Sequence, residues 1–528
     1  MMACGPMGFF LEHFTMELRH ESADNLYCKR RLLLTIRNLA LGFQPTLDLT
    51  GDFDSDDNVL VATRNKHFVN APMFSFCSDS PSVMVKLRRL CIQDDVFIFA
   101  FGCVLHALHN LCMDLVKEFP GIKNIVKHMV FLVKTIRKTH LIQQLFDKIS
   151  KEKYGQTLVL ILFTKTRWGT ICDAAKRLNH VRTAICQLPI EILSNELNID
   201  LAPKLRDIIL DAAFWKGLVA LEVLFSTICA CLMYLEGDES TLSSVYACFL
   251  AIAHHLRTLS SNVSTALQIV AANFDKMQSL VVNRLRTIYS PAHALSFRTD
   301  PLFNQMRTNL TALYGEDFLE LDGASILQQC KKALKCLANE GGIELNRKLQ
   351  AEFGHYIVRV IQDDDDFADV LAKPQDLWAL ADESTYPNMK NLLSAMHKNP
   401  TGASAGERNH KSVKRVHSRN RARLGASKVE IGTTIVFNAK QLQRRQSVMR
   451  NGRFLRWLSK IGTTENDVQA FDEEDEEDED DEQEGDLEDF LDEFVDVNIL
   501  VGVKQVQDDM LFNVEEEVID QGFVECAF

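Results

Sequence analysis

The chain lacks several patterns that would assign it to a familiar class. It has 14 cysteines but no Cys-x-x-Cys pair, and its first residues, MMACGPMGFF, lack the basic and long apolar regions of a signal peptide. It contains only 24 glycines and 12 prolines in 528 residues and no segment that repeats at a fixed period, which disfavours a fibrous protein or a solenoid. We therefore expect a folded intracellular protein whose cysteines are reduced and buried.

Positive charge is almost absent from the last 66 residues. Residues 463–528 hold 27 acidic residues and one Lys, a net charge of −26, whereas residues 1–462 hold 57 basic and 45 acidic residues, a net charge of +12. Like charges at this density repel, so we expect a largely disordered acidic tail over 461–528. The basic body permits an anionic partner such as DNA. The tail would bind basic proteins such as histones, or occupy the basic groove of the body as a DNA mimic.

Short apolar runs near the start of the chain predict strands. They are Phe14–Arg19, Arg30–Ala40, Met73–Phe76 and Val96–Phe101. Between the last two runs, PSVMVKLRRLC has apolar residues at helical spacing. A strand, a helix and a strand in this order predict a βαβ unit with two parallel strands.

From Gly102 to about residue 395 the pattern is helical, with apolar residues three and four apart and little Gly or Pro. The segment Gly217–Leu235 is apolar enough to be mistaken for a membrane span. It carries Glu222 and has no clear flanking charge bias, so we predict a buried helix and no membrane association.

Four local patterns follow one another in a fixed order. Asp24 ends a predicted strand in ADNLYCKRRLLLTI, and Asp79 ends another in FSFCSDSPSVMVKLRRL. The third pattern is GCVLHALHNLCMDL with the later TKTRWGTICDAAKRL. The fourth is a C-terminal segment with Pro387, small residues and basic residues, and its other marked positions are Ser404, Glu407, Arg408, Asn409, Arg419, Asn420, Arg423, Leu424 and Asn438.

Together these patterns resemble the hAT superfamily of DNA transposases. The resemblance implies an α/β, ribonuclease H-like core interrupted by a large all-α insertion. It divides the chain into a first core part (10–165), a helical insertion (166–340), a core completion and dimerisation region (341–460) and the tail (461–528). The family usually begins with a zinc-finger module, and no Cys/His zinc spacing precedes Asp24. We therefore expect an N-terminally incomplete or degenerate relative.

The chemistry implied by the resemblance is phosphodiester cleavage and strand transfer. Such chemistry uses two Mg²⁺ or Mn²⁺ ions held by carboxylates. The resemblance assigns this catalytic and metal-binding role to Asp24, Asp79 and Glu407, and the long insertion would let Glu407 return to Asp79. The family's usual Asp-Gly-Trp is here Asp24-Asn25-Leu26. The alternative for each residue is a helix cap or a solvated charge.

Two further pairs are candidates for DNA contact. Cys103 and His106 are spaced to share one helix face, and the resemblance places a DNA-organising Cys/His pair there. The alternative is a buried thiol and a core histidine; we expect no structural zinc, which would need two more ligands. In the family, the tryptophan matched by Trp168 stacks on a flipped base, beside which Arg167 would meet a phosphate. The alternative for Trp168 is a helix-packing anchor.

The run His410–Arg423 contains four Arg and two Lys. Three roles are open for this run: it would contact DNA phosphates, serve as a nuclear localisation signal, or form a solvated face. The DNA-binding candidates here are Arg408, Lys411, Lys414, Arg415, Arg419, Arg421 and Arg423.

These observations predict a nuclear, transposase-derived, DNA-associated protein that forms dimers or larger assemblies through its C-terminal region. Any enzymatic activity would be metal-dependent DNA cleavage, and an inactive remnant is favoured over an active enzyme. The alternative is a non-catalytic dimeric scaffold whose acidic tail binds basic partners.

Overall fold

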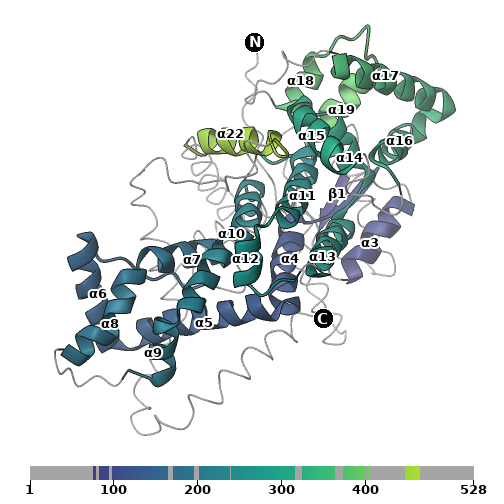
Figure 1. The fold of residues 1–528 in the computed structure, drawn as a ribbon. Helices are drawn as coiled ribbons and strands as arrows, with labels where there is room; N and C mark the ends of the chain where they lie inside the picture. The colour runs from purple at the N-terminus through teal and green to yellow at the C-terminus, as the bar shows by residue number, and fades with distance from the viewer. Residues whose placement is uncertain are drawn as a thin grey trace, which may run out of the picture. The chain divides into compact units, whose positions relative to one another are not determined.

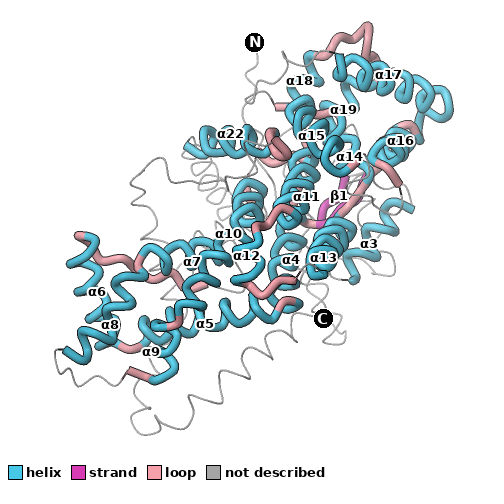
Figure 2. Tube along the Cα trace, in the orientation of Figure 1, coloured by secondary structure: helices cyan, strands magenta, loops and turns pink. Residues whose placement is uncertain are grey.

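A computed structural model describes residues 75–78, 82–93, 98–163, 170–194, 201–237, 239–270, 272–315, 324–362, 373–399, 401–402 and 446–463. They belong to one compact unit of the chain, Met1–Phe471. The described residues are mostly helical and include a small sheet of two strands (Figure 1, Figure 2). The predicted α/β chain with a large helical part is confirmed in that coarse form. The predicted strands Phe14–Arg19 and Arg30–Ala40, and the tail beyond residue 463, lie outside the described residues.

The sheet is built from one βαβ unit. Strand β1 is Ser75–Ser78, helix α3 is Ser82–Gln93 and strand β2 is Phe99–Gly102. The strands are parallel, with Ser75 opposite Phe99 and Ser78 opposite Gly102. The predicted parallel unit is confirmed, although each strand ends later in the chain than the apolar run indicated.

Helices from the second half of the chain pack against this sheet. Cys77, Phe99 and Phe101 are buried in one cluster with residues of α14, α16, α17, α18 and α19. These helices are Pro291–Arg298, Ile326–Leu337, Gly342–Gln362, Pro374–Leu380 and Met389–His397. The sheet core is thus completed by helices that begin almost 190 residues after β2.

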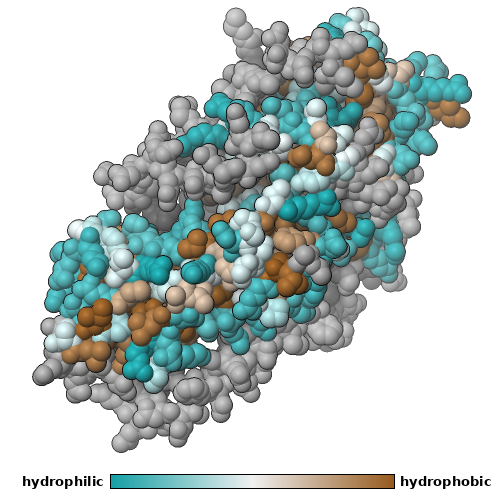
Figure 3. All heavy atoms as spheres, viewed as in Figure 1, coloured by the Kyte–Doolittle hydropathy of each residue, from teal (hydrophilic) through white to brown (hydrophobic). Residues whose placement is uncertain are grey.

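The described residues between β2 and α14 are mostly helical, as predicted. The helices are α4 Val104–Glu118, α5 Pro120–Lys138, α6 His140–Tyr154, α7 Thr170–His180, α8 Arg182–Ser194, α9 Pro203–Leu210, α10 Ala212–Leu235, α11 Leu242–Arg257, α12 Ser261–Ala266 and α13 Ala272–Ile288. The remaining described helices are the short η1 Pro301–Phe303 and η2 Asn339–Gly341, together with α15 Asn304–Tyr314 and α22 Gln446–Ser459. Figure 3 shows a mainly hydrophilic face on which apolar side chains gather over α8 and α9, where Ile190 and Leu193 are exposed.

Helix α10 lies inside the helical part. The carboxylate of Asp211 accepts a hydrogen bond from the backbone N–H of Ala213, 2.8 Å away, and caps its start. Among the described helices, α10 alone is long and apolar enough to cross a membrane, and 72% of its most apolar window is buried. It packs against α4, α5, α7, α11 and α12. This agrees with the buried helix predicted for Gly217–Leu235.

Ten cysteines with described side chains are free, and eight of these ten are buried. Burial raises the pKa of thiols such as Cys330, to about 12, because it disfavours the thiolate. The prediction of buried cysteines is confirmed for these eight.

Candidate functional site

The carboxyl ends of the two parallel strands form one edge of the sheet. The backbone N–H of Cys103, directly after β2, donates to the carbonyl oxygen of Ser78 at the end of β1, 2.7 Å away. Asp79 follows Ser78 in the sequence. Clefts outside the carboxyl ends of parallel strands are the usual location of ligand sites in α/β folds. We therefore take this edge as the candidate site.

Cys103 and His106 lie where β2 passes into α4. Cys103 is the N-cap residue of α4, and its side chain is 1% exposed and makes no capping hydrogen bond. His106 lies one turn further and is half-buried. Burial, and secondarily the neighbouring His106, lowers the pKa of His109 to about 4. At neutral pH the His109 imidazole is therefore uncharged.

The segment that leads toward Glu407 returns to the same edge. The Thr401 carbonyl accepts a hydrogen bond from the Val104 backbone N–H at 3.3 Å. A Cβ atom at Gly402 would lie 3.1 Å from the Cys103 Sγ, so the backbone here passes close to the thiol.

Side chains fix this returning segment at two further points. The Ser75 hydroxyl on β1 donates to the Asn399 side-chain oxygen at 2.7 Å. The hydroxyls of Ser240 and Thr401 share a buried hydrogen bond of 2.7 Å. The segment around residues 399–402 is therefore tied to β1, to the start of α4 and to the residue before the α11 cap.

A buried arginine also lies at this edge. Arg88, on α3, is 6% exposed, and its Nη1 donates to the Ser78 hydroxyl at 2.7 Å and to the Ser78 carbonyl at 3.3 Å. Its Nη2 donates to the Thr287 carbonyl at 3.2 Å. A guanidinium is always charged in proteins, so Arg88 places one positive charge beside the end of β1.

Arg88 was missed in the sequence analysis, although a signal was present. Met84, Leu87 and Arg88 follow the three- and four-residue spacing of one helix face, and all three are buried. The neighbouring Lys86 and Arg89 are exposed. The helical spacing therefore distinguishes Arg88, which lies on the buried apolar face, from the exposed Lys86 and Arg89.

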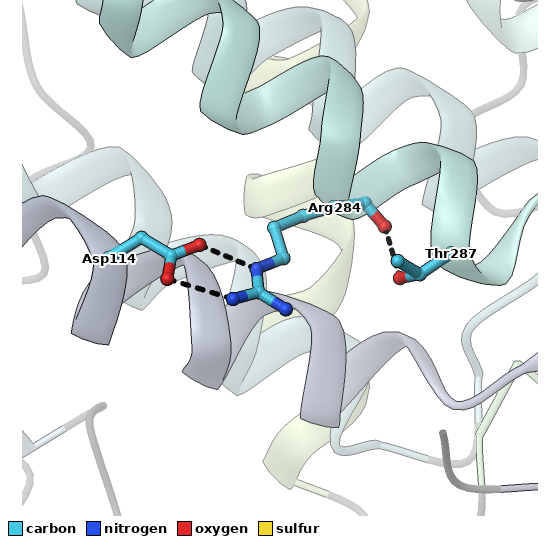
Figure 4. A network of polar contacts seen from close by, with 3 residues as sticks. All are labelled: Asp114, Arg284 and Thr287. Carbon is cyan, nitrogen blue, oxygen red and sulfur yellow. Dashed lines mark hydrogen bonds and ion pairs between the residues drawn. The ribbon is translucent and has the colours of Figure 1, made fainter. Parts of the chain in front are cut away.

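An ion pair holds α4, which carries Cys103 and His106, against α13 (Figure 4). The Asp114 carboxylate accepts from the Arg284 Nε at 2.6 Å and from its Nη2 at 2.8 Å. This two-bond geometry fixes both side chains more firmly than a single contact would.

Most of the predicted site residues lie outside the described residues. These are Asp24, Asp79, Arg167, Trp168, Glu407, Arg408, Lys411, Lys414, Arg415, Arg419, Arg421 and Arg423. The meeting of the three carboxylates therefore stays a prediction. Within the part of the chain that the structure describes, no group of three or more His, Cys, Asp or Glu side chains is placed to hold a metal ion.

No protein-family model matches the chain, and no curated protein matches it significantly. The resemblance to the hAT superfamily thus depends on the sequence patterns alone.

Proposed function

We propose that this chain is a nuclear, DNA-associated protein derived from an hAT transposase, with a ribonuclease H-like core and a C-terminal region through which it self-associates. The observation that carries the proposal is the meeting of three chain segments at one edge of the parallel sheet. Ser78, Cys103 and Gly402 belong to the second, third and fourth sequence patterns, and they lie together there.

Covalent connectivity extends this observation to the predicted carboxylates. Asp79 is bonded to Ser78, and Glu407 is five residues beyond Gly402. Five residues span at most about 18 Å, so both side chains are within chain reach of the same edge. Asp79 and Glu407 are more than 300 residues apart in the sequence. The closeness of the residues that flank them is therefore a result of the fold.

The donor set suits a hard cation. Asp24, Asp79 and Glu407 would hold Mg²⁺ or Mn²⁺ through carboxylate oxygens, and the ion would supply charge stabilisation for phosphodiester cleavage. Arg88 alters this balance, because its guanidinium already supplies one positive charge at the edge. A nearby cation stabilises an ionised carboxylate, which is also the form that binds a metal ion, so Arg88 is compatible with a retained carboxylate site.

DNA association is tested by fluorescence anisotropy of a labelled duplex titrated with the full chain. We expect binding at about 50 mM salt that weakens steeply by about 200 mM, because released counterions drive association with the phosphate backbone. Absence of binding at the lower salt concentration would contradict the proposed function.

The second candidate is a non-catalytic scaffold whose acidic tail binds basic proteins. It is favoured by the way residues 399–402 and α22 are used as packing elements within the body. Calorimetric titration with Mn²⁺ separates the two candidates. The chain is shortened after residue 463 so that tail carboxylates do not bind the metal.

A retained carboxylate site predicts saturable Mn²⁺ binding that Asp79→Ala and Glu407→Ala each abolish. Asp376→Ala, which removes an exposed carboxylate on α18, is the matched control and should leave binding unchanged. A scaffold predicts no saturable binding in any of the four proteins.

A further inference from the structure

Helix α22 has one apolar face, and that face is packed inside the molecule. Phe454, Leu458 and Ile461, the last just past the helix end, are each 5% exposed or less. The Phe454 ring stacks on Tyr234 of α10 with 4.8 Å between ring centroids. The helix also packs against α11 and α15. Burial of three large side chains fixes which face of α22 is turned inward.

The turn after α22 is fixed as well. Gly462 has φ of +85°, a backbone conformation that favours glycine. A Cβ atom there would lie 3.0 Å from the Cβ of Asn309 on α15. The Asn309 side-chain amide donates to the Ile461 carbonyl at 3.4 Å. The helix is thus held along its inner face and at its end.

The outer face of α22 carries only positive charge. Arg453 and Arg456 lie on one side of α22, three residues apart, and Lys460 is the first residue after the helix; all three are exposed. The helix contains no Asp or Glu. Within the described part of the chain, none of the three side chains forms an ion pair.

We propose that these three side chains, the α22 basic face, form a docking surface for the phosphate backbone of double-stranded DNA. The inference rests on the proposed DNA association and assigns one surface to it. Charge complementarity selects the partner, because residues 1–462 have a net charge of +12. A membrane surface is disfavoured, because an interfacial helix must insert apolar side chains and those of α22 are already buried.

Contacts of this kind position DNA without reading its sequence. Each cation lost from the interface lowers the salt dependence of binding by about one counterion, since log K falls with log salt at roughly 0.9 per phosphate neutralised. The α22 basic face therefore predicts a loss of about two to three in that slope when all three charges are removed.

The test compares two triple variants of the full chain by anisotropy with a random-sequence duplex over a range of salt concentrations. The first is Arg453→Gln, Arg456→Gln and Lys460→Gln. The control is Lys331→Gln, Lys332→Gln and Lys335→Gln, which removes three exposed charges from another helix without Asp or Glu, α16. Glutamine keeps a similar helix propensity, and equal thermal midpoints would verify that both variants fold.

We expect the α22 variant to bind at least about tenfold more weakly at about 100 mM salt, with the lower salt slope. The α16 variant should stay within about twofold of the parent. Equal weakening by both variants would overturn the inference, because it would mean diffuse attraction to the whole body. If the parent binds DNA and the α22 variant binds it equally well, the inference is overturned and the proposed function stands. A parent that does not bind DNA would overturn the proposed function and the inference with it.

Discussion

Two helical glycines differ in how closely other parts of the chain approach them. A Cβ atom at Gly121, in the first turn of α5, would overlap the carbonyl oxygen of Leu267, so the two backbones are in direct contact there. A Cβ atom at Gly354, inside α17, would meet nothing within 4 Å. The first glycine permits close packing of α5, and the second only loosens its own helix.

This difference predicts opposite effects for one substitution. Gly121→Ala should lower the free energy of unfolding by about 2 kcal/mol, because a backbone must move and the gain in helix propensity is smaller than that cost. Gly354→Ala should raise it by about 0.5–1 kcal/mol. Urea unfolding followed by circular dichroism measures both. A Gly121→Ala variant as stable as the parent would show that α5 is not packed as described.

Individual site residues could be predicted from the sequence only where a local pattern contains the information. The spacing of Cys103 and His106 placed them together, and both lie at the carboxyl edge of the sheet. The sequence did not show that the Cys103 thiol faces Gly402, because this contact joins residues nearly 300 positions apart. Contacts across such separations depend on tertiary packing, which a local period does not encode.

Among the helices, the ion pair between Asp114 and Arg284 is the best-formed link between two elements near the site. Its side chains are 22% and 27% exposed, respectively, so solvent screens it only in part. Two parallel N–H to oxygen bonds also lower its freedom compared with a single-contact pair.

A double-mutant cycle with Asp114→Asn and Arg284→Gln should give a coupling energy of about 1 kcal/mol. The exposed pair Lys148 and Glu152 on α6, with nitrogen and oxygen 4.0 Å apart, should show no measurable coupling. Similar coupling in both pairs would contradict the view that geometry and burial distinguish them.

The positions of helices and strands along the chain were predicted better than the elements that they pack against. Apolar runs and helical spacing located β1, α3 and β2, because each pattern reflects burial of that element's own face. The inward packing of α22 was not predicted. Its sequence is rich in Arg, and only the three-residue to four-residue spacing of Phe454, Leu458 and Ile461 marks the buried face.

At the scale of the molecule, buried histidines oppose stability in acid. Burial lowers the pKa of four of them to about 4 or below: His109, His255, His293 and His397. Asp300 acts in the opposite direction, because burial raises its pKa to about 6. Between pH 4 and 6.5 the unfolded chain therefore binds more protons through the histidines and fewer through Asp300.

The histidines outnumber the carboxyl group, so the free energy of unfolding should fall as pH decreases from about 6.5 to 4. Each proton taken up on unfolding changes that energy by about 1.4 kcal/mol per pH unit. Urea unfolding at several pH values measures the slope, and His397→Asn should reduce it by about one proton. A stability that is constant over this range would contradict the burial of these imidazoles.

The long-range organisation could be predicted only in outline. Periodicity identified helices after Gly102 but not which of them return to the sheet, because helices with similar apolar faces can pack in many combinations. The return of α16 to α19 to the strands is set by shape matching around Phe99, Phe101 and Trp378. The order of the sequence motifs was the one feature that predicted a late segment would complete an early core.

The most direct test of the account is a photo-cross-linking measurement at the carboxyl edge of the sheet. Asp79 is replaced by p-benzoylphenylalanine in the full chain, and cross-linked tryptic peptides are identified by mass spectrometry. The same amino acid at Ile190, an exposed position on α8, serves as the control. The account predicts cross-links from position 79 to peptides containing residues 102–108 and 399–410, and none of these from position 190. Cross-links from position 79 that exclude residues 399–410 would contradict the proposed meeting of Asp79 and Glu407.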